Sequence, residues 1–199
     1  MDEDLTLLTR WTAGDATAGR DLVRRHFDEV YRFFEHKVGG DADDLVQRTF
    51  TAIVESRERF RGMSSFRTYL FAIARNQLYA HLRRMPHAEH VDFEDTSIDA
   101  LVTSLGSRLD RAREIEVLRA VLRELPAEQQ LLLELHYWHE LDAAALAEVF
   151  GVPPGAIRVR LSRARSALRA RMEAHGEATF AAITGDRLVD SVTHPEPDD

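Results

Sequence analysis

Residues 141–165 read LDAAALAEVFGVPPGAIRVRLSRAR, and this stretch decides the fold of the second half of the chain. Asp142 is a residue type favoured at a helix N-cap, and Gly151 is the type that most often ends a helix. Pro154 suits the first turn of a second helix, because the backbone amide that proline lacks would be unpaired there in any case. The pattern predicts two short-linked helices, a helix-turn-helix.

The second of these helices has an apolar side and a basic side. Val152, Ile157 and Leu161 are expected to face inward. The outward and flanking side chains are Arg158, Arg160, Ser162, Arg163 and Arg165. A helix of this width and charge fits the major groove of DNA, where arginine pairs with guanine or with phosphate. The alternative is a solvated basic helix that ends a helical domain.

Apolar residues recur with helical spacing along almost the whole chain, and no convincing strand period occurs. The sequence therefore predicts an all-α protein of two small helical domains joined by a flexible acidic linker. We expect domains at 1–86 and 108–175, the linker at 87–107, and an acidic tail at 176–199. The expected helices span 4–13, 16–38, 41–60, 64–84, 108–124, 127–139, 142–150 and 154–174.

The formal net charge is -8, yet the basic residues are concentrated in two blocks. Residues 57–84 hold seven arginines and one glutamate, and residues 154–171 hold six arginines and no acid. Residues 87–101 hold five acids and no base. Such blocks favour a nucleic-acid partner, because guanidinium groups bind phosphates and base edges. The alternative is that the arginines only reflect the base composition of the genome.

Several function classes are disfavoured. There is no cysteine, which excludes disulfides, thiolate zinc sites and thiol nucleophiles. The start of the chain is acidic and no apolar run reaches the roughly 20 residues that span a bilayer, so we expect a cytoplasmic protein without a membrane partner. No Walker loop, nucleophile elbow or dinucleotide fingerprint is present, so we expect neither enzymatic activity nor a cofactor.

One alternative is a metal-dependent helical enzyme built on His136 and His139. The two side chains could share a metal at a spacing of three. However, the spacing of a zinc-protease motif is missing and no third ligand is evident, so we expect no metal site.

Residues 59–76 read RFRGMSSFRTYLFAIARN and suit the capture of unpaired DNA. The small residues of the loop 61–65 allow a backbone to approach a base, and Tyr69 offers a ring. The arginines of this stretch supply phosphate partners. Phe60 and Phe66 also carry rings, but we expect these two in the core.

This stretch, together with DDLVQRTF at 43–50, resembles region 2 of extracytoplasmic-function sigma factors. Leu125-Pro126 through the helix-turn-helix resembles region 4 of the same family. The two matches cover roughly residues 4–84 and 108–172, in the family's order and with a linker between them. The resemblance implies an alternative sigma factor, which binds core RNA polymerase and directs it to particular promoters.

The resemblance also assigns DNA-binding residues. It places Arg61, Ser64, Ser65, Tyr69, Arg75 and Asn76 at the minus-ten element, where the loop 61–65 would hold a flipped base. It places Arg158, Arg160, Ser162, Arg163 and Arg165 at the minus-thirty-five element. Ala72 and Ile73 stand where housekeeping sigma factors carry paired tryptophans, which implies weaker strand opening and stricter promoter choice.

Polymerase contacts follow from the resemblance as well. Asp44 and Gln47 would grip the clamp helices of the largest subunit, beside Arg48, where the family usually has glutamate. The polymerase flap would be a second contact, and the acidic linker would thread channels that otherwise hold nucleic acid. The alternative, equally consistent with its composition, is that the linker is only a disordered acidic tether. Core RNA polymerase and promoter DNA are thus the expected partners, with an anti-sigma factor as a further candidate.

The main alternative is a conventional helix-turn-helix regulator whose first block serves dimerisation or ligand binding. Such a dimer binds paired half-sites about one helical turn apart. A sigma factor alone would bind duplex DNA poorly and asymmetrically.

Overall fold

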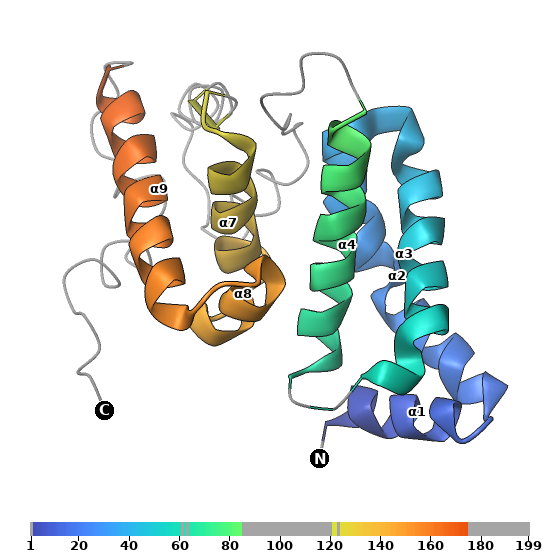
Figure 1. Cartoon of the computed structure of the whole chain (residues 1–199). Helices are drawn as coiled ribbons and strands as arrows, with labels where there is room; N and C mark the ends of the chain where they lie inside the picture. Colours follow the sequence, from blue (N-terminus) through green and yellow to red (C-terminus); the bar gives the residue numbers. More distant parts are fainter. Residues whose placement is uncertain (1, 61, 63, 85–120, 123, 175–199) are drawn as a thin grey trace, which may run out of the picture. The chain divides into compact units, whose positions relative to one another are not determined.

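The computed structural model describes residues 2–60, 62, 64–84, 121–122 and 124–174. In the first part it has α1 (Glu3–Thr12), α2 (Ala16–Val38), α3 (Ala42–Ser56) and α4 (Phe66–Leu82), with short 3-10 turns at Gly39–Asp41 and Arg57–Arg59. In the second part it has α7 (Ala127–Tyr137), α8 (Ala143–Phe150) and α9 (Pro154–Ala174). Every regular element in the described residues is a helix, which confirms the predicted all-α class (Figure 1).

Some of the expected segments are not described. The predicted linker 87–107, the tail 176–199 and nearly all of the predicted helix 108–124 lie outside the described residues. The chain divides into two compact units. The first contains α1 to α4 together with α8, and the second contains α7 and most of α9.

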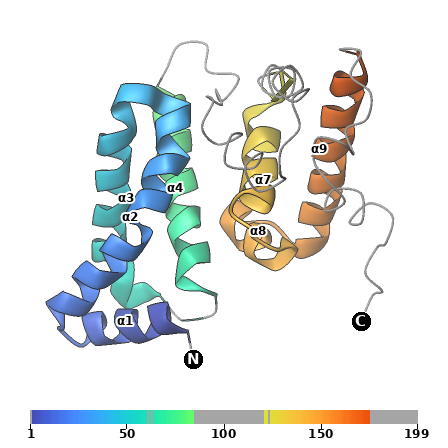
Figure 2. The ribbon, with the colours of Figure 1, turned by 180° about the vertical axis from the view of Figure 1, so that it is seen from behind.

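In the first unit α2, α3 and α4 run side by side, and α1 lies across one end of them (Figures 1 and 2). Their core is aromatic: Phe33, Phe34 and Phe71 are fully buried. The rings of Phe33 and Phe71 meet edge to face with centroids 5.5 Å apart, a favoured arrangement for aromatic pairs. This packing ties α2 to α4.

The starts of α1 and α2 have polar caps, and the packing of the two helices depends on one glycine. Asp2 accepts a hydrogen bond from the amide of Asp4 at the start of α1, and Asp15 accepts from the amides of Thr17 and Ala18 at the start of α2. A Cβ atom at Gly19 would lie 2.5 Å from the indole of Trp11. Glycine at this position therefore allows the two helices to approach each other closely.

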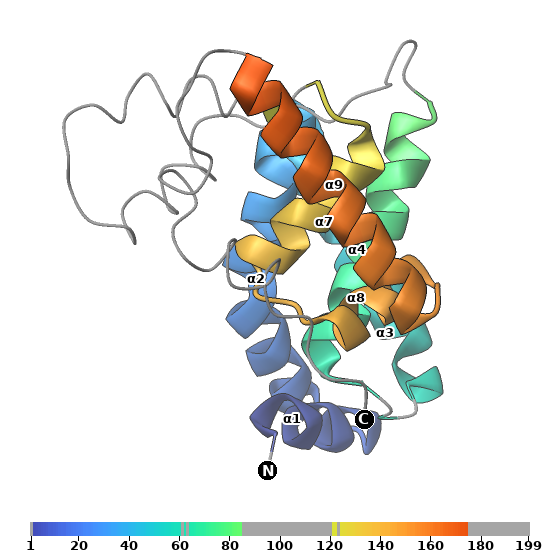
Figure 3. The ribbon, with the colours of Figure 1, turned by 90° about the vertical axis from the view of Figure 1, so that its left-hand side faces the viewer.

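In the second unit α9 crosses α7 (Figures 1 and 3), and Arg165 of α9 contacts Tyr137 at the end of α7. Buried residues of α7 include Leu131, Leu132 and Leu135, and α9 buries Leu168 and Met172. These two helices therefore have a core of aliphatic side chains.

The predicted caps of the helix-turn-helix are confirmed. The Asp142 carboxylate accepts a hydrogen bond from the amide of Ala145 at 2.7 Å, and α9 begins at Pro154. Gly151 ends α8 with a φ of 66°, in the left-handed region that glycine adopts without strain. The amide of Val152 then bonds the carbonyl of Ala147 at 3.0 Å, which closes the turn.

Among the helices of the described residues, none combines the length and the apolar character that a membrane span requires.

Candidate nucleic-acid interface

The first candidate surface is the amino-terminal half of α4 and the loop before it. Ser65 is the N-cap of α4, and its hydroxyl accepts a hydrogen bond from the amide of Thr68 at 3.0 Å. Ser65 is exposed and Ser64 is half-buried, while Arg61 lies outside the described residues. Gly62 has a φ of 68°, so the loop turns at a position that favours glycine.

Helical spacing brings several predicted residues to one face of α4. Ser65, Tyr69 and Asn76 differ by four and seven positions, which places them along one side of the helix. Asn76 is exposed and Tyr69 is half-buried. Ala72 and Ile73, both half-buried, lie between them. The side chains of this face are therefore uncharged.

Tyr69 is held from two sides. Its hydroxyl lies 2.5 Å from the Ser56 hydroxyl at the end of α3, and its ring lies 4.9 Å from the ring of Phe60. Phe60 is half-buried, whereas Phe66 is 1% exposed, which confirms the prediction of a core position for Phe66.

Arg75 lies beside this face rather than on it. Within the first unit its guanidinium stacks over the ring of Tyr79, 4.5 Å from the centroid, and over that of Phe150 at 4.7 Å. Its Nη1 donates to the carbonyl of Val149 at 3.5 Å. In this arrangement Asn76 is open to a ligand and Arg75 is half-buried.

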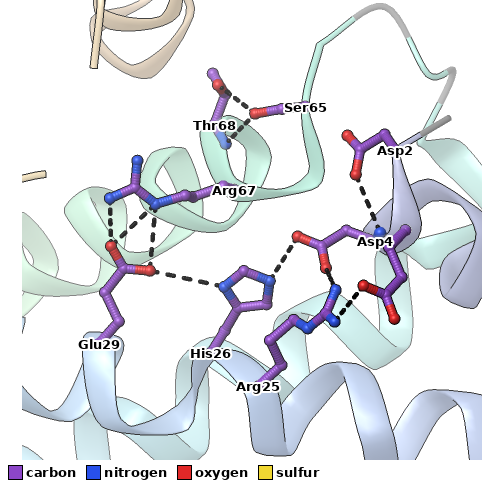
Figure 4. A network of polar contacts seen from close by, with 9 residues as sticks. Asp2, Asp4, Arg25, His26, Glu29, Ser65, Arg67 and Thr68 are labelled. Atoms are coloured by element: carbon purple, nitrogen blue, oxygen red, sulfur yellow. Dashed lines mark hydrogen bonds and ion pairs between the residues drawn. The ribbon is translucent and has the colours of Figure 1, made fainter. Parts of the chain in front are cut away.

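Sequence reasoning missed the surroundings of Arg67, which the charge count treated as part of a basic block. Its Nε atom donates to Glu29 Oε1 at 3.0 Å (Figure 4). On the other side of Glu29, His26 lies between that carboxylate and Asp4. Glu29 and Arg67 are far apart in the sequence, so no local spacing could have indicated their pairing.

The second candidate surface is the outer side of α9. Arg158, Ser162 and Arg163 are exposed, as the spacing predicts, and Ile157 and Leu161 are buried. Val152, also expected to face inward, is half-buried. The exposed side chains follow one another along the helix and share a side with Val159, which is 49% exposed.

Two other arginines of α9 are engaged within the second unit. Arg160 pairs with Glu128 at 2.5 Å. Arg165 is only 9% exposed, and it donates to the Tyr137 hydroxyl at 2.6 Å. Burial raises the pKa of Tyr137, although the nearby Arg165 acts in the opposite direction. The predicted DNA contacts of these two arginines would require them to leave these partners.

His136 and His139 have protein partners as well. His136 Nε2 lies 3.0 Å from Arg165 Nη2, and His139 Nε2 lies 3.7 Å from Glu134 Oε1. Within the part of the chain that the structure describes, no group of three or more potential metal ligands occurs.

A third surface, on α3, is polar along one side. Asp44, Gln47 and Arg48 are all exposed, and Arg48 pairs with Asp44 one turn away at 2.8 Å. The apolar spacing of α3 would place Val54 on the buried face with Phe50 and Ile53, but Val54 is 41% exposed. Val54 lies two turns beyond Gln47 on the same side of α3.

Val54 also borders an open hollow of about 570 Å³ between α1, α2 and α3. Trp11 and Phe27 line this hollow, and Phe27 is 42% exposed. An exposed apolar patch beside exposed polar residues is typical of a protein-binding surface.

Comparison with known protein families identifies the two parts of the chain that carry these surfaces. Residues 22–85 match the family model described as Sigma-70 region 2, and residues 115–168 match Sigma-70, region 4. The first match contains the α3 and α4 surfaces, and the second contains the helix-turn-helix. The two matched segments are thus those of a sigma factor.

Individual relatives point to one branch of this class. The chain is 34% identical over 179 residues to the ECF RNA polymerase sigma factor SigC of Mycobacterium tuberculosis, covering 86% of this chain and 93% of SigC. It is 31% identical to the ECF sigma factor SigF of Caulobacter vibrioides, covering 83% and 92%. It therefore belongs to the extracytoplasmic-function (ECF) sigma factors, proteins that direct transcription initiation and are not enzymes.

Solved structures agree. CnrH, in its complex with the cytosolic domain of CnrY, superimposes with a TM-score of 0.62 at 25% identity, covering 87% of this chain and 99% of CnrH. RpoE of Bartonella quintana, solved with the anti-sigma factor NepR, shares the fold with a TM-score of 0.54 at 22% identity. This second match covers 76% of this chain and 92% of RpoE.

Proposed function

We propose that this sigma factor binds core RNA polymerase through the polar side of α3 and the hollow beside it. The observation that carries this proposal is the exposed row of Asp44, Gln47 and Val54, with Phe27 next to it. A row that combines charge, an amide and an apolar side chain supports a specific protein partner. The family resemblance makes the polymerase clamp helices the candidate. Because Arg48 already pairs with Asp44, we infer that the partner must compete with this internal ion pair.

For DNA, we infer two separate contacts. The loop 61–65 with Tyr69 and Asn76 takes the unpaired minus-ten strand, and Arg75 joins this contact if its guanidinium leaves its ring partners. The exposed side of α9, with Arg158, Ser162 and Arg163, takes the minus-thirty-five duplex. Exposure on a helical face supports the assignments of Asn76 on α4 and of Arg158, Ser162 and Arg163 on α9.

We also propose an anti-sigma factor as a regulator and the cytoplasm as the place of action. The support for a regulator is similarity in fold to CnrH and RpoE, whose structures hold CnrY and NepR. Regulation of this kind would act by covering the surfaces that bind polymerase or DNA.

Run-off transcription tests the proposed function. Core RNA polymerase is assayed with and without this protein on promoters from its own genomic neighbourhood. We expect discrete transcripts only when the protein is present. If the protein instead binds duplex DNA as a dimer without polymerase and yields no transcript, the conventional regulator is the better description.

A further inference from the structure

A chain of alternating charges connects three helices of the first unit (Figure 4). It begins on α1, where Asp4 Oδ2 lies 2.7 Å from His26 Nε2 on α2. One turn along α2, Glu29 Oε2 lies 3.6 Å from His26 Nδ1. Glu29 then accepts a hydrogen bond from Arg67 Nε at 3.0 Å, which brings the chain of contacts to the first turn of α4.

The charges in this network balance only when His26 is protonated. Arg25 extends it on the α1 side, where it donates to Asp4 at 2.8 Å and pairs with Glu3 at 2.5 Å. With a protonated imidazole, three bases face three acids. Since His26 is only 6% exposed, little water is available to replace a missing partner.

The network ends directly beside the loop that precedes α4. Arg67 is the second residue of that helix, and Phe66, the first, packs its ring 5.3 Å from the ring of His26. Ser65, which caps the helix, is the last residue of the loop. Side chains of α2 therefore contact both Phe66 and Arg67, and these two residues directly follow the end of the loop.

We propose that Asp4, His26, Glu29 and Arg67 are positioning residues that hold the first turn of α4, with Ser65 at its N-cap, in place for the unpaired minus-ten strand. The inference rests on the proposed minus-ten contact of Ser65 and the α4 face that follows it. A surface that is fixed before binding loses less conformational entropy when it binds a base, so its affinity is higher. Under this proposal Arg67 acts through Glu29 and makes no phosphate contact.

The ionisation of His26 fits the same arrangement. Burial opposes the charged imidazole, but hydrogen bonds and charges from Glu29 and Asp4 outweigh burial and raise its pKa. The folded protein therefore favours the protonated form, which completes the network, more than the unfolded chain does.

The test measures binding of a fluorescent single-stranded oligonucleotide to holoenzyme, assembled from the full chain and core polymerase. The oligonucleotide carries the minus-ten region of a promoter that gives a run-off transcript. The variants are Asp4→Asn and Glu29→Gln, which keep side-chain size and remove charge. Asp4→Asn tests the far end of the network, because Asp4 lies on α1 and is linked to Arg67 through His26 and Glu29.

Asp41→Asn provides a matched control. Asp41 also faces a histidine of α4, His81, at 3.7 Å, but at the far end of that helix. We expect both network variants to bind the oligonucleotide roughly tenfold more weakly, the factor that one charge-assisted hydrogen bond supplies. The control should bind like the wild type, and all three should keep normal affinity for core polymerase and for minus-thirty-five duplex.

Three results separate the possible failures. Wild-type holoenzyme that does not bind the oligonucleotide would overturn the proposed function of the loop. If the wild type binds and the network variants match Asp41→Asn, the positioning role is wrong, even where their melting temperatures are lower. The double variant Asp4→Asn/Glu29→Gln gives a further check. If the two residues act in one network, the double variant should lose little more oligonucleotide affinity than the single variant with the larger loss. Additive losses of affinity would contradict a single network.

Discussion

At the scale of single residues, burial separates arginines that the sequence presents as equivalent. Arg163 is exposed on α9, whereas Arg165 is 9% exposed and bonded to Tyr137 and His136. We expect Arg165→Ala to lower the free energy of unfolding by about 1.5 to 3 kcal/mol, the range for hydrogen bonds to charged groups. Arg163→Ala should change it by less than about 0.5 kcal/mol, as is usual for surface positions. Urea unfolding measures both, and equal midpoints for the two variants would contradict this assignment.

His26 should make stability depend on pH. Its pKa is raised in the folded protein, mainly because Glu29 and Asp4 outweigh the opposing effect of burial. The folded state therefore holds the proton more tightly than the unfolded state, whose histidine titrates near about 6.5. This stabilisation is complete below that pH and is lost as the pH rises through the higher, folded-state pKa.

The measurement is the melting temperature of the wild type and of His26→Gln at a series of pH values. The groups that face the imidazole are Asp4 from α1, Glu29 from its own helix and the ring of Phe66 from α4. The difference between the two proteins should shrink as the pH rises above about 6.5. If the difference in melting temperature stays constant across this pH range, the proton on His26 does not contribute to stability.

The sequence alone predicts the roles of residues whose partners lie close to them along the chain. Asp142, Gly151 and Pro154 act within one helical turn, so their residue types were sufficient to predict their roles. Glu29 and Arg165 depend on partners from other helices, and a chain position carries no information about such partners. The apolar character of Val54 likewise does not show whether a neighbouring helix covers it, and in the structure it is 41% exposed.

At the scale of helices, the outer side of α3 is expected to determine assembly with polymerase. Asp44→Ala combined with Gln47→Ala should weaken binding to core polymerase while α3 stays folded, because exposed polar substitutions change stability by only about 0.5 kcal/mol. Thr6→Ala combined with Thr9→Ala, an exposed pair with the same spacing on α1, is the control. Co-purification with polymerase is the measurement, and undiminished recovery of the Asp44/Gln47 variant would exclude this face.

On α9, position along the helix should distinguish base readout from backbone contact. In recognition helices the first turns reach base edges, and later turns lie near phosphates or solvent. A bidentate pair with guanine contributes about 1 to 3 kcal/mol of discrimination. Arg158→Ala or Arg163→Ala should therefore reduce transcription and relax the preference at one or two base positions.

A randomised minus-thirty-five library measures that preference. Arg171 serves as the comparison, because it lies farther along α9 and approaches Glu124 at 3.6 Å. Arg171→Ala should leave the preference profile intact. Uniform loss across the library for Arg158→Ala and Arg163→Ala would mean that these arginines bind phosphate.

Helix boundaries show what local signals predict at this scale. The expected helix 64–84 begins at Phe66, because Ser65 supplies the N-cap, and the expected helix 41–60 ends at Ser56 before a 3-10 turn. Composition alone does not distinguish a last α-helical turn from a 3-10 turn, since both tolerate the same residues.

At the scale of the whole molecule, the prediction of two independent domains is open to a direct test. Helices α1 to α4 bury a full set of aromatic residues, including Phe33 and Phe71, whereas α7 and α9 bury aliphatic residues. Two chemically distinct cores favour separate folding, because each can exclude water without the other. The domain boundaries at 86 and 107 remain predictions.

We expect fragments 1–86 and 107–175, expressed separately, each to unfold cooperatively with heat. The position of α8 makes the second fragment the more informative, because the structure groups α8 with α1 to α4 although the sequence match places it with the helix-turn-helix. If 107–175 folds alone, α8 does not need the first unit, and the predicted boundaries hold. The opposite result is that only the first fragment folds and that adding residues 140–157 in trans raises its melting temperature. In that case α8 belongs to the first core, and the linker does not separate two independent domains.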